Sequence, residues 1–144
     1  MVRKRQRRQR GAALAEAAIG FSVLILLVFG IIEAAMLFQD HELLYNITRE
    51  ATRRMAVGDT PSTAESKALK WNSANKGLNA NTVAFTVEQS ADASTWTSIA
   101  DTTQATSGNW VRVRATYSHK NVTGFFGSNF TLPATAVMRV EKGS

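Results

Sequence analysis

Cysteine is absent from the 144 residues, and the chain contains only two histidines, His41 and His119. Without cysteine there are neither disulfides nor thiolate metal sites nor thiol nucleophiles. The sequence also lacks a glycine-rich phosphate loop between a strand and a helix, and it has no serine in a nucleophile elbow. We therefore expect no catalytic residues, no metal ligands and no cofactor.

Acidic residues are missing from the first ten positions, where basic residues are concentrated. These positions hold six of the 17 Lys and Arg residues and none of the 11 Asp and Glu residues. The rest of the chain therefore has 11 basic and 11 acidic residues and is formally neutral. A basic excess often indicates nucleic-acid binding, because Lys and Arg neutralise phosphates. Here the excess is confined to a short arm before an apolar run, which is typical of the cytoplasmic flank of a membrane segment. We therefore expect no nucleic-acid partner.

Charge is nearly absent from residues 17–38 as well, since Glu33 is the single ionisable side chain among these 22 residues. About 20 apolar residues suffice to span the hydrocarbon core of a bilayer. The pattern predicts a helix that crosses a membrane, with a cytoplasmic N-terminus and an extracytoplasmic C-terminal part. A cleaved secretory signal stays open as an alternative, with Ala34 and Ala35 as its weak cleavage site.

The helical pattern continues beyond the apolar run. Apolar residues recur there at spacings of three and four, namely Leu44, Ile47, Ala51 and Met55. Glu50 can meet Arg53 and Arg54 one turn further on, and Gly58 is well placed to end the helix. We predict one helix over about 12–57, with its first half in lipid.

The basic arm stops at Gly11, and the first acidic residue, Glu16, follows five positions later. If the chain is cut after Gly11, Ala12 gains an α-amino group with a pKa near 8. This positive group and the Glu16 carboxylate can compensate each other, within one chain or between neighbouring subunits. Glu33 is expected either at a headgroup region or in contact with another membrane helix.

Residues 59–144 predict a small α+β head. The spacing of Ser62 and Glu65 is that of a capping box, which predicts a short helix over 62–76 that ends at Gly77. Alternation of apolar and polar residues then predicts four antiparallel strands. Their expected ranges are 82–88, 96–99, 109–118 and 132–141.

Two groups of side chains in this head are candidate contact sites. Arg112 and Arg114, with Lys120 nearby, form either the solvated side of a strand or a basic face for an acidic polymer or a surface. Three aromatic residues lie in and after the loop before the last strand. They either cap the core or contact another subunit, and they are Phe125, Phe126 and Phe130.

The segment from Arg10 to Glu16, with a basic arm before it and an apolar helix after it, resembles the prepilin peptidase site of type IV pilins and pseudopilins. Phe29-Gly-Ile-Ile-Glu33 and Arg49-Glu-Ala-Thr-Arg-Arg-Met-Ala-Val-Gly58 are, more narrowly, similar to TadE-like minor pilins of tight adherence (Tad) pili. The stretch 134–141 also resembles the end of those proteins. Family members often have a bulky residue after the glutamate, whereas this chain has Ala17.

The resemblance implies a leader over 1–11, a long helix over 12–58 that is anchored in the bacterial inner membrane, and an extracytoplasmic head over 59–144. It implies cleavage between Gly11 and Ala12 by a prepilin peptidase, and assembly with other pilins and the Tad machinery into an adhesive pilus at the cell surface. Two further interpretations remain. One is a membrane-anchored binding module that never enters a filament, and the other is a secreted domain with a cleaved signal.

We expect Glu16→Ala to leave membrane insertion intact and to impair assembly, because the variant loses the carboxylate that compensates a new N-terminus at Ala12. Membrane fractionation and the yield of surface filaments measure the two effects. Normal assembly of this variant would contradict the pairing.

Overall fold

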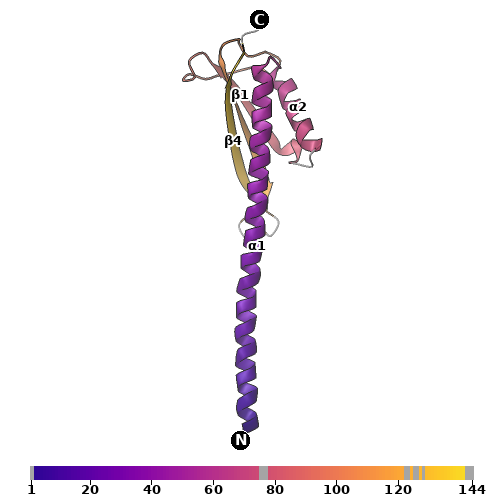
Figure 1. The fold of residues 1–144 in the computed structure, drawn as a ribbon, viewed down its shortest axis with the longest axis vertical. Helices are drawn as coiled ribbons and strands as arrows, with labels where there is room; N and C mark the ends of the chain where they lie inside the picture. The colour runs from indigo at the N-terminus through magenta and orange to yellow at the C-terminus, as the bar shows by residue number, and fades with distance from the viewer. Residues whose placement is uncertain (1, 75–77, 122–123, 125–126, 128, 142–144) are drawn as a thin grey trace. The chain divides into compact units, whose positions relative to one another are not determined.

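The described part of the chain comprises residues 2–74, 78–121, 124, 127 and 129–141 of a computed structural model. Two helices precede four strands, with a short 3-10 turn at Ala80–Thr82 (Figure 1). The chain forms two compact units, Met1–Met36 and Leu37–Ser144. The predicted α+β fold class, with a long apolar helix, a short second helix and an antiparallel sheet, is confirmed.

Helix α1 is longer than predicted, since it covers Val2–Ala56 rather than about 12–57. Its first ten residues are mostly Arg, Lys and Gln, which are good helix formers, and they include no proline. Gly11 inside the helix costs only about 1 kcal/mol relative to alanine, so it does not interrupt the helix. The division between leader and helix at Gly11 is therefore not visible in the backbone.

The C-terminal end of α1 is closed by Gly58, as predicted. The amide of Gly58 donates to the carbonyl of Met55 (3.1 Å), and the amide of Asp59 donates to the carbonyl of Arg54 (3.0 Å). This pair of bonds is the Schellman motif, which satisfies carbonyls that the helix leaves without a partner. Gly58 has φ of +110°, a conformation that residues with a Cβ rarely adopt.

Helix α2 covers Pro61–Ala74, and its cap differs from the prediction. The amide of Ala64 donates to the carbonyl of Thr60 (2.9 Å), and the hydroxyl of Thr60 donates to Oγ1 of Thr63 (3.0 Å). Thr60 is therefore the capping residue and Pro61 the first helical residue, where its missing N–H costs nothing. The predicted capping box at Ser62 is wrong, because Ser62 already lies inside the helix. Gly77, the predicted end, lies outside the described residues.

The four strands form one antiparallel sheet in the order β2-β1-β3-β4. Their bounds are Val83–Ser90 for β1, Thr97–Ser98 for β2, Trp110–Lys120 for β3 and Asn129–Arg139 for β4. All four predicted strands are present. The last one begins three residues earlier than expected, because Asn129, Phe130 and Thr131 continue the pairing with the end of β3.

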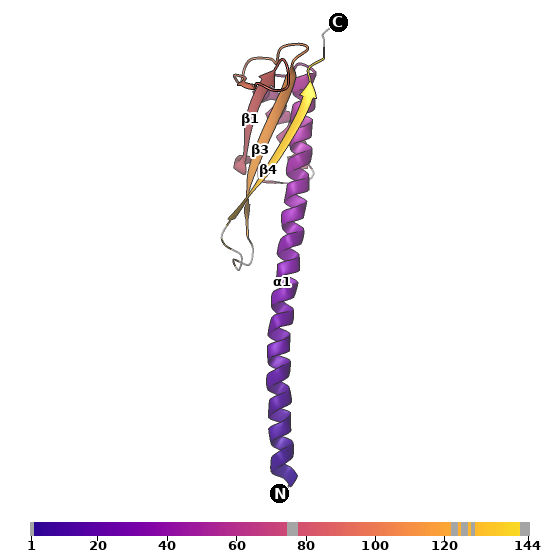
Figure 2. The ribbon, with the colours of Figure 1, turned by 90° about the vertical axis from the view of Figure 1, so that its left-hand side faces the viewer.

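One side of the sheet is buried and the other is exposed. On β3, Val111, Val113 and Ala115 are buried, whereas Arg114 and Thr116 between and beside them are exposed. The buried side chains join a single core with residues of both helices, including Leu44, Ile47, Ala51, Met55, Ala64 and Ala68. Figure 2 shows β1, β3 and β4 side by side in front of the magenta part of α1. The predicted apolar stripe of α1 is confirmed as a core surface.

We expect Gly58→Ala to lower the free energy of unfolding by about 1–2 kcal/mol, because alanine is strained at φ of +110°. Chemical unfolding of the chain in detergent micelles measures the change. Gly20→Ala is the matched control, since Gly20 is helical and an added Cβ there meets nothing within 4 Å. An equal loss in both variants would show that the positive φ is not the cause.

Candidate membrane anchor and processing junction

Large apolar side chains are exposed on every side of α1 within the first unit. They include seven consecutive residues from Val23 to Phe29, which together turn about twice around the helix. Further exposed apolar residues extend this surface in both directions within the unit, among them Leu14, Ile19, Phe21, Ile31, Ile32 and Met36. A helix that is apolar all round is stable in a membrane or among other apolar helices, not in water.

The length of this surface matches a bilayer. Residues 17–38 rise about 33 Å along a helix, close to the thickness of the hydrocarbon core. By length and composition, the segment beginning at Ala13 qualifies as a membrane span, and very little of its apolar window is buried within the protein. The prediction of an N-terminal apolar helix suited to membrane anchoring is confirmed in this respect.

The two carboxylates of this segment differ in exposure. Glu16 is exposed, whereas Glu33 is 2% exposed and is the one buried side chain among the described residues of the first unit. The interactions expected for Glu16 with a new N-terminus, and for Glu33 with another membrane helix, remain predictions.

Gly11 lies inside α1 and is exposed. A Cβ added at Gly11 would meet nothing within 4 Å, and its φ lies outside the left-handed region. Neither packing nor backbone conformation therefore requires glycine at this position, although glycine weakens a helix by about 1 kcal/mol relative to alanine. Gly20 shares these properties.

A polar cluster that sequence reasoning missed lies at the start of the second unit. Nδ1 of His119 on β3 lies 2.7 Å from Oδ2 of Asp40 on α1, and His119 is 5% exposed. Tyr117, two residues earlier on the same side of β3, is close enough to Asp40 to sense its charge. Burial first, and then the charge of Asp40, raise the pKa of Tyr117 above its ordinary value. This carboxylate ties the helix to the strand.

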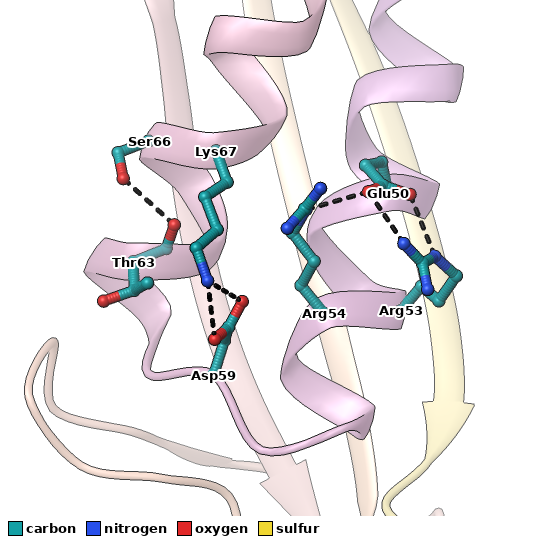
Figure 3. Close-up of polar contacts among 7 residues, drawn as sticks. All are labelled: Glu50, Arg53, Arg54, Asp59, Thr63, Ser66 and Lys67. Atoms are coloured by element: carbon teal, nitrogen blue, oxygen red, sulfur yellow. Dashed lines mark hydrogen bonds and ion pairs between the residues drawn. The ribbon is translucent and has the colours of Figure 1, made fainter.

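At the other end of α1, the predicted pairing of Glu50 with Arg53 and Arg54 is confirmed (Figure 3). Both Nε and Nη2 of Arg53 donate to the Glu50 carboxylate at 3.0 Å, and Nε of Arg54 lies 2.8 Å from it. The hydrogen bond from Arg53 is the main cause that lowers the pKa of Glu50. Together with the cap at Gly58, these contacts give the 49–58 motif a structural role.

A second ion pair closes the connection between the helices. Nζ of Lys67 on α2 lies 2.9 Å from Oδ2 of Asp59, directly after the α1 cap (Figure 3). Surface pairs of this kind contribute at most about 1 kcal/mol each. Their arrangement here fixes the turn between α1 and α2 rather than forming a reactive site.

The remaining candidate residues lie on the sheet. Arg112 and Arg114 both face Glu88, at 2.7 Å and 3.4 Å. Phe130 pairs with His119 across β3 and β4 and is 38% exposed. Phe125 and Phe126 lie outside the described residues, so the predicted aromatic contact patch remains a prediction. Among the described residues there is no group of three or more His, Cys, Asp or Glu side chains that could hold a metal ion.

A family model described as TadE-like protein matches residues 11–53. Residues 11–53 of this chain are TadE-like. The match begins at Gly11 and ends at Arg53, so it covers the apolar segment and the helical stripe but none of the sheet. No curated protein and no solved structure matches the chain. The similarity to TadE-like proteins is thus limited to a part of α1.

We expect Asp40→Ala to lower the free energy of unfolding by about 1–3 kcal/mol, because it removes the carboxylate that pairs with the buried side chain of His119. Urea unfolding in detergent measures this change. Glu42→Ala, two residues further along the same helix at an exposed position, is the control and should change stability by less than about 0.5 kcal/mol. Similar values for both variants would contradict a stabilising role of Asp40.

Proposed function

We propose that this chain is a TadE-like minor pilin or pseudopilin of a Tad-type pilus. In this proposal it is anchored in the bacterial inner membrane, is cut after Gly11 by a prepilin peptidase, and takes part in pilus assembly and adhesion. The observation that carries the proposal is the apolar surface around α1, which lies within the TadE-like segment that starts at Gly11.

The orientation follows from charge. The six basic residues before Gly11 favour a cytoplasmic N-terminus, whereas the region after Phe38 carries mixed charges. The sheet and α2 are then extracytoplasmic. In this orientation Gly11 lies on the cytoplasmic side of the membrane, where a peptidase can act before the chain is assembled.

The glycine itself supports processing. Packing and backbone conformation do not require glycine at position 11, as the open space around its missing Cβ shows. Glycine at position 11 weakens the helix without a structural benefit, which is consistent with a peptidase that requires glycine before the cleaved bond. Cleavage would remove the six basic residues and leave a formally neutral chain that begins at Ala12.

Assembly is physically reasonable because lipid tails and neighbouring apolar helices offer similar surroundings. A helix that exchanges one for the other gains little from the hydrophobic effect and associates through packing and a few polar contacts. Ala12 and Glu16 are four residues apart and lie on the same side of α1. The pairing of a new α-amino group with Glu16 would supply one such polar contact.

Mass spectrometry of the chain, isolated by a C-terminal tag from membranes and from sheared surface filaments, tests the proposal. We expect an N-terminus at Ala12 in both fractions. An intact leader in membranes and absence from filaments would instead support an anchored binding module. A chain that begins after about Ala35 would support a secreted domain with an ordinary signal.

Gly11→Ala, with Gly20→Ala as its matched control, separates processing from the stability of the helix. Both substitutions remove a helical glycine with open space around it. We expect the first variant alone to retain the leader, and equal processing of both would contradict recognition of Gly11.

A further inference from the structure

The side of the sheet opposite the core carries a concentrated positive charge. We call it the open face and define it by its charged residues on β1, β3 and β4. Four of them are basic, Arg112, Arg114, Lys120 and Arg139, and one is acidic, Glu88. Figure 2 shows this side of the strands toward the viewer, with no helix in front of them.

This excess contrasts with the rest of the protein. After Gly11 the chain has equal numbers of basic and acidic residues, so a net positive face requires an acidic excess elsewhere. Asp92, in the turn after β1, accepts hydrogen bonds from Ser90, Ser94 and Thr95, which hold its carboxylate within that turn. The open face itself carries four basic residues and one acidic residue, and a face with a net positive charge attracts a negatively charged partner.

The guanidinium groups on the open face are held in place. Arg112 is bonded to Glu88 and stacks on the ring of Trp96, with its Cζ 4.1 Å from the ring centroid. Arg114 shares the same carboxylate at 3.4 Å but keeps half of its side chain exposed. Nε of Arg139 donates to the carbonyl of Gly108 (3.1 Å). Arginines fixed in this way offer their outer N–H groups to a carboxylate at little entropic cost.

The spacing of these groups fits an extended polymer. Arg112 and Arg114 are two residues apart on one strand, about 7 Å, and Arg139 lies on the diagonal from Arg112 at about 7–8 Å. Thr86 and Thr135 lie on either side of Arg114 in the sheet register. In this row a cationic group therefore lies between two hydroxyls, which can both donate and accept hydrogen bonds.

Among the described residues on this side of the sheet, no tryptophan has a fully exposed ring on which a nucleobase could stack. Of the tryptophans on this side, Trp96 is covered by Arg112, and Trp110 is only partly exposed. Proteins that bind single-stranded nucleic acids combine a basic groove with exposed aromatic rings. A partner rich in carboxylates and hydroxyls fits the open face better than one that carries bases.

We propose that the open face binds an acidic polysaccharide, with Arg114, Lys120 and Arg139 contacting its carboxylates. Thr86 and Thr135 contact its hydroxyls. The inference goes beyond the proposed function, because binding requires neither cleavage after Gly11 nor incorporation into a filament.

Binding of polygalacturonate to the full-length chain in zwitterionic nanodiscs tests this proposal. The test variant is Arg114→Gln/Lys120→Gln/Arg139→Gln, which leaves Arg112 with Glu88 and Trp96. We expect it to bind at least about tenfold more weakly than the parent at low salt and to depend less on salt. Thr135→Glu, which adds one negative charge beside Arg114, should weaken binding in the same direction.

The matched control removes three positive charges from the basic arm, Arg5→Gln/Arg7→Gln/Arg8→Gln, and should keep the affinity of the parent for the polymer. A loss of binding in this control but not in the open-face variant would overturn the proposal. So would absence of binding to polygalacturonate, equal binding to neutral dextran, or binding of single-stranded DNA alone through the open face. Circular dichroism of each variant verifies that the head is folded.

Discussion

The apolar surface that surrounds the helix over residues 17–38 is the main physical constraint on this protein, because it decides in which surroundings the helix is stable. In water such a surface is strongly unfavourable, because the hydrophobic effect scales with the apolar area exposed. Lipid and a bundle of similar helices are both acceptable surroundings, so exchange between them costs little. Dispersion contacts have no preferred direction, so specific association of such helices requires polar groups. Glu33 is the single ionisable side chain within residues 17–38.

The same helix changes character after Phe38. From Leu44 to Met55 a single apolar stripe faces the core, and the carboxylate of Asp40 bonds to β3 at the beginning of this part. Many of the buried core residues are alanines, and each alanine buries little apolar area. Polar contacts at the ends of helices and strands therefore help to hold these elements in place. The Schellman cap, the Thr60 cap and the bond from the amide of Glu141 to the carbonyl of Ala56 all serve this purpose.

Patterns with strong periodicity were predicted well. The stripe of α1, the pairing of Glu50 with two arginines, the stop at Gly58 and the four strands depend on residues close in sequence, where spacing directly implies geometry. Two predictions failed locally. The helix continues through the basic arm because good helix formers surround Gly11. Helix α2 is capped by Thr60 because proline is well suited to the first position of a helix, which Pro61 occupies.

By itself, the sequence determined the class of the protein, since composition and periodicity alone decide where an apolar helix can exist and which side of each strand is buried. His119 is buried on β3, one residue beyond the end of the strand predicted over 109–118. Its partner Asp40 lies 79 positions away, and only the tertiary structure brings the two together. The same holds for Arg112, Trp96 and Glu88, because strand register and loop path decide which charges share a face, and neither follows from local spacing.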